Sequence, residues 1–364
     1  MKRKINLLLV SVSFSPESGL GLVEHGVRLY KGLKKYSKEV NVQARSLFGD
    51  KIFYAINKKM RNKYPVKIET MDKKRNKPDI IHYLSPGIFM SNSVIRLFSN
   101  EKAKQVVTIH DLDAIKKVPK IGVNNYINKE LSKGPMKIVN RFLNYMENRG
   151  IYLTVKKADH ILCVSDLTKN DLIETFHVNP NRISVIYNVI GKEFRKTKKK
   201  SNKKIVIGHL SSYAYNKNVE VLINAFKKVK SDKFELHLYG ASMPFDISDD
   251  KRIKYFGHAE DTVKMYNSFD VFAFPSKWEG FGMPVMEAKS CMVPVITYKN
   301  GQLPDVVKRN TCQFKTEEDL TEIIEKMAWK KIDIKAAYSD TKECREEYVI
   351  KKSEEMYRKV LEVK

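Results

Sequence analysis

Short apolar runs alternate with longer helical patterns along most of the chain, and this rhythm restricts the possible folds more than any other feature. The runs predicted as strands lie at Ile5–Val12, Val40–Ser46, Asp79–Leu84, Gln105–Ile109, His160–Val164, Ile183–Tyr187, Lys204–Leu210, Phe234–Tyr239, Asp270–Phe274 and Pro294–Thr297. The predicted helices lie at Leu20–Tyr36, Lys137–Lys157, Leu167–Phe176, Val219–Lys230, Asp261–Phe269, Pro284–Cys291, Glu317–Trp329 and Thr341–Val363. Strands of Val, Ile and Leu alternating with helices are typical of doubly wound parallel sheets, so the predicted fold class is α/β.

The alternation stops at residues 195–204, where seven of ten residues are basic. This composition suits a solvated linker better than a packed strand or helix. A chain of 364 residues is long enough for two cores. We therefore predict a first domain over 1–194, a linker over 195–204 and a second domain over 205–340. A C-terminal helix over 341–364 is expected to pack back on the first domain.

The formal net charge is +26. A balance this basic favours a polyanionic partner or an anionic membrane surface, or it reflects a lysine-rich proteome. Nucleic acid is the less favoured partner because the basic run lies mid-chain without interleaved aromatic residues. No apolar run is long enough to span a bilayer, so any membrane contact is expected to be peripheral. The four cysteines form no CxxC pair, which favours reduced thiols, a cytoplasmic location and no metal site.

The stretch from Phe274 to Thr297 carries the clearest chemistry. A predicted strand ends at Phe274, a glycine-containing loop follows, and Pro284 stands where a helix should begin. Proline suits the first helical position, and the free N–H groups of a helix N-terminus can bind a phosphate. Glu279 and Glu287 flank this predicted anion site and can accept hydrogen bonds from sugar or ribose hydroxyls. The spacing also allows a plainer interpretation, in which Glu287 complements the helix dipole and Glu279 is a surface residue.

This stretch resembles the signature of retaining glycosyltransferases of family 4, in which seven residues separate two glutamates. The matching residues are Pro275, Ser276, Glu279, Gly280, Phe281, Gly282, Pro284, Glu287, Ala288, Pro294 and Val295. The resemblance implies the GT-B fold, two Rossmann-like domains facing each other across a cleft. It also implies transfer of a hexose, with retention, from a UDP-, GDP- or ADP-linked nucleotide-sugar to a glycan, lipid-linked or other hydroxyl acceptor.

The same resemblance assigns roles around the two glutamates. Glu279 would bind hydroxyls of the transferred sugar, and Glu287 would hold the ribose. Backbone amides would meet the diphosphate and the sugar at Gly280, Phe281, Gly282 and Met283. Three positions depart from the family pattern: Gln302, Asp305 and Met292. Met292 stands where the family usually has glycine, a position that often requires a left-handed backbone.

The start of the second domain resembles the segment in which Arg and Lys clamp the diphosphate. His209 stands at the arginine position, and Lys217 follows an insertion around Ser212–Tyr215. The resemblance makes both candidate diphosphate ligands, with Lys217 a candidate catalytic residue. Lys217 can also be interpreted as a solvated lysine at a helix start.

Two first-domain segments also resemble the family. Gly19 and Gly21 follow the first strand, in the loop that approaches the phosphates and the acceptor. His110 ends a predicted strand, and the resemblance places it against the transferred sugar as a catalytic residue. Open α/β sheets bind ligands at the carboxyl ends of their strands, which agrees with this assignment. His82 is predicted to be structural or to lie on the acceptor side.

No residue is an obvious covalent nucleophile, and the family is usually described as front-face. Catalysis would then rest on positioning and on stabilising charge on the leaving diphosphate, without a metal or a further cofactor. Basic stretches at Lys51–Pro78 and Lys116–Lys157 could dock on anionic lipid headgroups or form a solvated surface. Two alternatives stay open: a basic membrane- or nucleic-acid-binding protein on a catalytically decayed GT-B fold, and a nucleotide-sugar epimerase.

Overall fold

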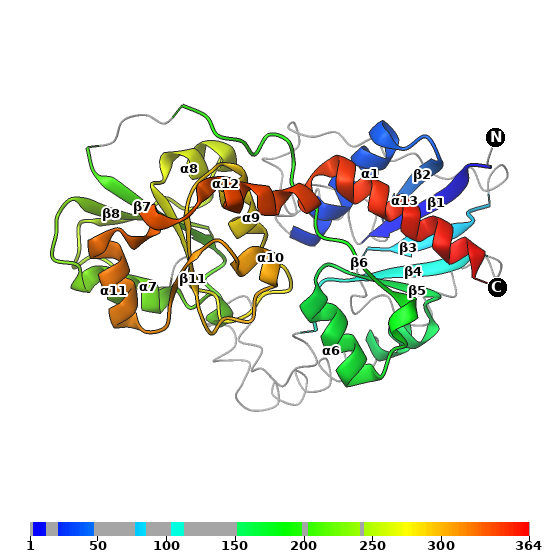
Figure 1. Cartoon of the computed structure of the whole chain (residues 1–364), viewed down its shortest axis with the longest axis horizontal. Coiled ribbons are helices and arrows are strands. Elements are labelled where there is room, and N and C mark those ends of the chain that lie inside the picture. Colours follow the sequence, from blue (N-terminus) through cyan, green and yellow to red (C-terminus); the bar gives the residue numbers. More distant parts are fainter. Residues whose placement is uncertain are drawn as a thin grey trace. The chain divides into compact units, whose positions relative to one another are not determined.

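The computed structural model describes residues 3–11, 21–46, 77–84, 103–112, 151–198, 203–240 and 244–363. These residues form two compact units (Figure 1). The first unit contains the described residues up to Val189 and those from Cys344 onward, and the second runs from Ile190 to Glu343. Each unit has a parallel sheet of its own, as the strand and helix rhythm predicts.

The first unit contains a six-stranded sheet in the order β2-β1-β3-β4-β5-β6, and every neighbouring pair is parallel. Its strands are β1 (Ile5–Ser11), β2 (Val40–Ser46), β3 (Ile80–Tyr83), β4 (Lys104–Ile109), β5 (His160–Cys163) and β6 (Ile183–Val185). The side chains of β3 and β5 are buried throughout, so both faces of the sheet are covered.

Described helices of the first unit are α1 (Gly21–Tyr36), α6 (Asp166–Phe176), η2 (Pro180–Arg182) and α13 (Glu346–Glu362), together with a helical segment at 151–157. α13 lies alongside α1, although the two are far apart in sequence (Figure 1). Val349, Ile350 and Tyr357 of α13 join the core cluster that also contains Leu29 and Leu33 of α1. The C-terminal helix thus belongs to the first unit, where burial of its apolar face stabilises it.

The second unit also contains a six-stranded parallel sheet, in the order β12-β11-β10-β7-β8-β9. Its strands are β7 (Ile205–Ser211), β8 (Phe234–Gly240), β9 (Ile253–Tyr255), β10 (Val271–Phe274), β11 (Val295–Tyr298) and β12 (Cys312–Phe314). β9 and β12 have three residues each and lie at the two edges. These two edge strands were not predicted, because their short runs carry too little periodicity.

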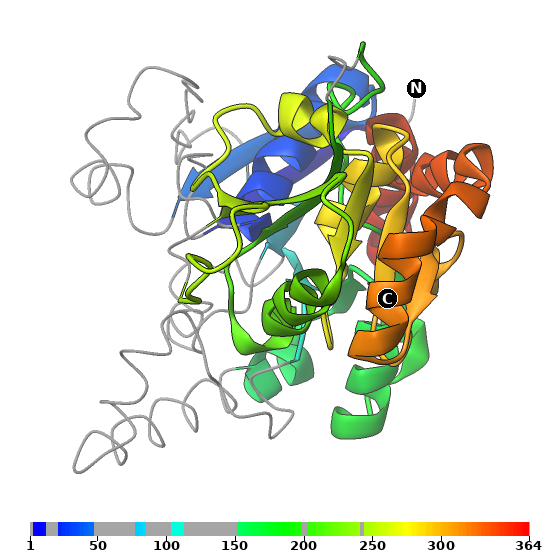
Figure 2. The ribbon, with the colours of Figure 1, turned by 90° about the vertical axis from the view of Figure 1, so that its left-hand side faces the viewer.

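The helical segments of the second unit are η3 (Tyr215–Lys217), α7 (Val219–Lys228), α8 (Thr262–Ser268), α9 (Met283–Ser290), α10 (Asp305–Lys308), α11 (Glu317–Lys326), η4 (Ala328–Lys331), α12 (Ile334–Ser339) and η5 (Asp340–Cys344). α7 and α11 lie side by side, as Figures 1 and 2 show. Leu222 and Phe226 of α7 and Leu320 and Ile324 of α11 share one core cluster with the sheet.

The boundary between the units differs from the predicted one. Phe194 was assigned to the first domain, but its buried ring packs against Tyr266 of α8 in the second unit. The following residues are held there as well: Asn267 donates to the Arg195 carbonyl (3.0 Å) and accepts from the Thr197 N–H (2.7 Å). The start of the basic run is therefore attached to α8, and the units divide between Val189 and Ile190.

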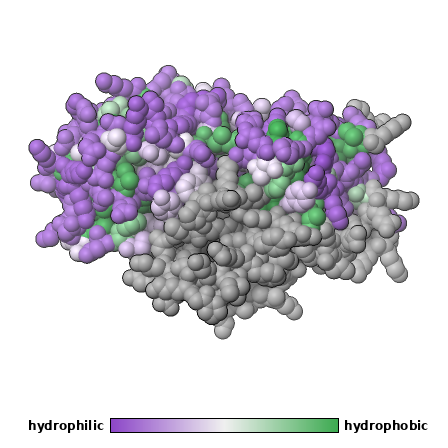
Figure 3. Space-filling model, turned by 90° about the horizontal axis from the view of Figure 1, so that it is seen from below, coloured by the Kyte–Doolittle hydropathy of each residue, from purple (hydrophilic) through white to green (hydrophobic). Residues whose placement is uncertain are grey.

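The surface of the described residues is predominantly hydrophilic on the face shown in Figure 3, with hydrophobic residues in small separate spots. Among the described residues, no helix is both long enough and apolar enough to cross a membrane. The four cysteines are free thiols, three of them buried.

Candidate active site

The strand order of the second sheet reverses between β7 and β10. From β7, successive strands are added outward through β8 to β9, and β10 then lies on the other side of β7. Connections leave the carboxyl ends of β7 and β10 toward opposite sides, which opens a crevice where α/β proteins bind ligands. Lys217 follows β7 and Glu279 follows β10, so the two candidate residues lie at this switch point.

Lys217 and Glu279 form an ion pair in which the lysine bridges both carboxylate oxygens. The distances from Nζ are 2.7 Å to Oε1 and 2.9 Å to Oε2. The side chains are 21% and 12% exposed, so solvent screens this pair less than an open surface pair. The interpretation of Lys217 as a solvated surface lysine does not fit this contact.

Hydrogen bonds join the two loops that carry this ion pair. The Lys277 N–H donates to the Asn216 carbonyl (2.7 Å), and the Asn216 side chain donates to the Trp278 carbonyl (3.2 Å). Gln302 joins from a third loop, because its N–H donates to the Lys277 carbonyl (2.8 Å) and its carbonyl accepts from the Glu279 N–H (3.1 Å). The backbone around Glu279 is therefore fixed on two sides.

Helix α9 begins directly after this loop, at the predicted anion site. Its N-cap is Gly282, with φ 104° and ψ 47°, and no side chain caps the helix. A Cβ on Gly282 would lie 3.1 Å from Cγ1 of Val307, so both backbone conformation and space favour glycine. Of the other residues assigned here, Gly280 and Met283 are half-buried and the Phe281 side chain is buried. Unsatisfied N–H groups at such a terminus suit an anion.

Glu287 lies in the second turn of α9 and is half-buried. Its Oε2 accepts a hydrogen bond of 2.8 Å from the Tyr266 hydroxyl of α8. The tyrosine fixes the orientation of the carboxylate. Sequence reasoning missed Tyr266, because it lies on a different helix and no local pattern connects the two residues.

His209 does not have the contacts of a diphosphate ligand. It is fully buried on β7, its Nδ1 donates to the Ala273 carbonyl (2.9 Å), and its Nε2 contacts the Ser211 hydroxyl (2.8 Å). Burial, with a smaller contribution from the charge of Lys217, lowers its pKa to about 4. A neutral ring with both nitrogens engaged cannot replace an arginine, so we correct this prediction and assign His209 to positioning β7 against β10.

Among the first-unit candidates, His110 follows the carboxyl end of β4, and its Nε2 donates to the Leu84 carbonyl (2.9 Å). Its ring lies edge-on to that of His25, with 5.7 Å between centroids. Burial lowers the pKa of His110, and the neighbouring Asp111 opposes that shift. Gly21 is the first residue of α1, whereas Gly19 lies outside the described residues.

His82 is a structural residue of the first unit, as one of its two predicted roles proposed. It is fully buried, with Nδ1 2.7 Å from the Tyr357 hydroxyl of α13 and Nε2 2.7 Å from the Thr108 hydroxyl. It thereby connects β3 to β4 and to the C-terminal helix. Burial lowers its pKa to about 3.

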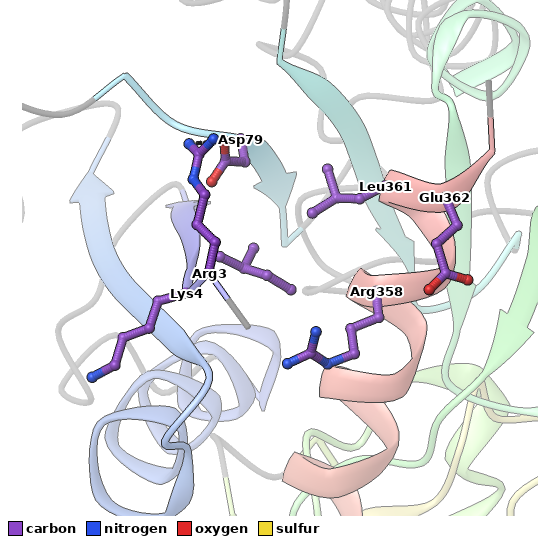
Figure 4. A pocket seen from close by; sticks show the side chains of 7 residues that line it. Arg3, Lys4, Asp79, Arg358, Leu361 and Glu362 are labelled. Atoms are coloured by element: carbon purple, nitrogen blue, oxygen red, sulfur yellow. Dashed lines mark hydrogen bonds and ion pairs between the residues drawn. The ribbon is translucent and has the colours of Figure 1, made fainter. Parts of the chain in front are cut away.

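A pocket of about 320 Å³ in the first unit lies at the amino-terminal end of β1, and residues near the end of α13 also line it (Figure 4). Three of its charged lining residues are in ion pairs: Arg3 pairs with Asp79 (2.9 Å), and Arg358 pairs with Glu39. It lies away from the carboxyl ends of the strands, so we do not assign the candidate site to it.

Several solved structures share this architecture. A glycosyltransferase from Rickettsia africae aligns over 100% of both chains, with a TM-score of 0.67 and 16% identity. HepE from Anabaena, solved in complex with UDP and glucose, aligns over 97% of this chain and 99% of its own, with a TM-score of 0.64 and 16% identity. These similarities and the paired parallel sheets define the class of protein: the chain has the two-domain GT-B fold, as predicted.

Two family models cover successive parts of the chain. The model for Glycosyl transferases group 1 matches residues 191–335, and the model for Glycosyltransferase Family 4 matches residues 49–194. The chain therefore belongs to the group 1 glycosyltransferases and is a transferase enzyme, and the second model favours family 4 within that group.

Curated relatives agree with this family. The O-antigen chain mannosyltransferase RfbU of Salmonella typhimurium is 22% identical over 313 residues, which is 79% of this chain and 81% of the relative. The capsular polysaccharide biosynthesis glycosyltransferase CapM of Staphylococcus aureus is 27% identical over 195 residues, 47% of this chain and 51% of the relative.

Proposed function

We propose that the protein transfers a hexose from a nucleotide-sugar to a glycan or lipid-linked hydroxyl, with retention at the anomeric carbon. The observation that carries this proposal is the Lys217–Glu279 ion pair at the switch point of the second sheet, one loop before the N-terminus of α9. A carboxylate for hydroxyls, a cation for phosphate and an open helix end together suit an activated sugar.

Each group has one task in this proposal. Glu279 accepts hydrogen bonds from the sugar hydroxyls, and Glu287, oriented by Tyr266, accepts from the ribose. Lys217 and the amides around Gly282 oppose the negative charge that develops on the leaving diphosphate. Removing one preorganised donor of this kind costs about 2.7–4 kcal/mol of transition-state stabilisation in other enzymes.

The proposed reaction needs no resident metal or organic cofactor, because Lys217 and the helix end oppose the charge on the diphosphate. The acceptor is proposed to be a saccharide or a lipid-linked saccharide. The names of RfbU and CapM, which refer to O-antigen and capsular polysaccharide, support this proposal. The net charge of +26 supports peripheral contact with an anionic membrane surface on the cytoplasmic side.

Release of nucleotide from a panel of UDP-, GDP- and ADP-hexoses tests the proposal. We expect slow hydrolysis of one donor by the protein alone, unchanged by EDTA, and faster release with a saccharide acceptor. Proton NMR of the product would show the anomeric configuration of the donor. A chain that releases no nucleotide from any donor, and whose melting temperature no nucleotide raises, would contradict the proposal.

A further inference from the structure

Two aromatic rings and a lysine lie next to the Lys217–Glu279 pair along the chain, and the proposed chemistry does not use them. The rings of Tyr215 and Trp278 have centroids 6.1 Å apart and planes inclined by 55°. The ammonium of Lys277 lies 3.8 Å from the centroid of the Tyr215 ring. Tyr215 is 46% exposed, and the other two residues are half-buried. We call Tyr215, Lys277 and Trp278 the aromatic cluster.

The cluster is held by the same loops that hold the ion pair. Tyr215 begins η3, which ends at Lys217, and Trp278 directly precedes Glu279. The hydrogen bonds of Asn216 to Lys277 and Trp278 join the two loops between the rings. Trp278 also forms a backbone bridge with Gln302. The rings are therefore preorganised on rigid backbone, and little conformational entropy is lost when they bind a ligand.

The chemistry of the cluster suits the face of a sugar ring. Aromatic faces carry partial negative charge, and the axial C–H groups of a pyranose carry partial positive charge, so the two surfaces attract each other. The ammonium of Lys277 adds N–H donors for hydroxyl groups. An apolar aromatic surface with few polar groups is the usual composition of a small-ligand site.

We propose that the aromatic cluster binds a sugar ring of the acceptor saccharide, close to the site where Glu279 holds the donor. The inference rests on the proposed function, because only a glycosyl transfer supplies a second saccharide at this place.

The contacts of Lys277 disfavour a diphosphate as the occupant. Its ammonium faces the Tyr215 ring, whereas Lys217 and the N-terminus of α9 already offer a cation and N–H groups to phosphates. An anionic membrane surface would use the same residue types, and the experiment includes it as the competing occupant.

Tryptophan fluorescence provides a direct assay. The chain has two tryptophans, and Trp329 is only 2% exposed, so an added sugar reaches only Trp278. The full-length protein is titrated with neutral methyl glycosides and disaccharides of glucose, galactose, mannose and N-acetylglucosamine. We expect a saturable change in the emission with at least one of them.

Three variants separate ring stacking from general effects. Tyr215→Ala should weaken saccharide binding by about tenfold, because the more exposed ring of the cluster is lost. Tyr215→Phe keeps the ring and should bind as the wild type does. The matched control is Tyr338→Ala, at a tyrosine that is 39% exposed on α12 and outside the cluster. Saturation-transfer NMR on Trp278→Ala, which lacks the reporter, should show the same loss.

The inference is overturned if no saccharide changes the emission, or if Tyr215→Ala binds as tightly as the wild type. It is also overturned if phosphatidylglycerol vesicles, and not saccharides, cause a change that depends on Tyr215. Nucleotide binding, measured on the same samples by thermal shift, separates the two proposals. Loss of the saccharide effect with intact UDP or GDP binding contradicts only the aromatic cluster, whereas saccharide binding without nucleotide binding contradicts only the proposed donor chemistry.

Discussion

At the scale of single residues, the sequence motif identified the loop of the candidate donor site but not the contacts that hold it. The frame around Glu279 and Glu287 places both carboxylates near the start of α9, and the structure agrees. Tyr266, Asn216 and Gln302 act through long-range contacts that no local pattern encodes. His209 was predicted from its sequence position to bind the diphosphate in place of an arginine. It is instead buried, its pKa is lowered to about 4 by that burial, and its side chain serves a structural role.

The Lys217–Glu279 pair gives the first prediction. Glu279→Gln and Lys217→Met should each lower donor turnover by about 10²–10³-fold, because each removes one preorganised polar group from the sugar diphosphate. The double variant should lose little more than either single one, since the two residues act as a unit. Nucleotide release under saturating donor measures this. Additive losses would show that the two side chains act independently.

Met292 gives the second prediction. It has a left-handed backbone, with φ 56°, at the end of α9, where the sequence pattern predicted a position suited to glycine. Met292→Gly should raise the free energy of unfolding by about 1 kcal/mol, because glycine adopts this conformation without strain. Urea denaturation measures the change. Glu322→Gly, within helix α11, is the control and should destabilise by a similar amount.

At the scale of elements, most predicted strands and helices lie within two residues of the observed ones, but the C-terminal helix begins at Glu346 and not at the predicted Thr341, and α11 ends at Lys326 and not at Trp329. α7 was predicted at Val219–Lys230 and is observed at Val219–Lys228, since its apolar residues recur at helical spacing. α10 and α12, with four and six residues, carry too few turns to show a period. Their positions depend on tertiary contacts, which sequence periodicity does not record.

A buried ion pair on helix α9 gives the third prediction. Lys289 of α9 has a fully buried side chain, and its Nζ lies 2.8 Å from Oδ2 of Asp340. Oδ1 of the same carboxylate accepts from Nε of Arg309 (2.7 Å). Asp340→Ala should destabilise the protein by about 3–5 kcal/mol, because it leaves the buried ammonium without its counter-ion.

Lys289→Met combined with Asp340→Ala should recover part of that stability, since no unpaired buried ammonium remains at position 289. Urea denaturation of the single and double variants tests this. A double variant less stable than Asp340→Ala would contradict the argument.

At the scale of the whole molecule, buried histidines give the fourth prediction. Burial lowers the pKa of His82 to about 3 and that of His160 and His209 to about 4, from an ordinary value near 6.5. The unfolded chain therefore takes up protons first as the pH falls below about 6.5, and this favours unfolding. Each such histidine should cost the fold about 2 kcal/mol by pH 5.

Urea unfolding at pH 7.5, 6 and 5 measures this dependence. His82→Gln should reduce the loss of stability on acidification, because the substituted side chain does not titrate. His258→Gln, at an exposed position, is the matched control. An equal loss of stability at acid pH in the wild type and in the His82 variant would exclude His82 as a cause.

Because the C-terminal helix packs on the first unit, the outcome of proteolysis depends on where the chain is cleaved. The described residues of the second unit all lie between Ile190 and Glu343, and the chain passes to the first unit at Val189–Ile190 and at Glu343–Cys344. Cleavage at Val189–Ile190 would leave the described part of the second unit covalently joined to α13 alone, and the packing of α13 on α1 would then hold that fragment to the rest of the first unit. The first unit, in contrast, loses α13 and the Tyr357–His82 hydrogen bond whenever the chain is shortened from that side.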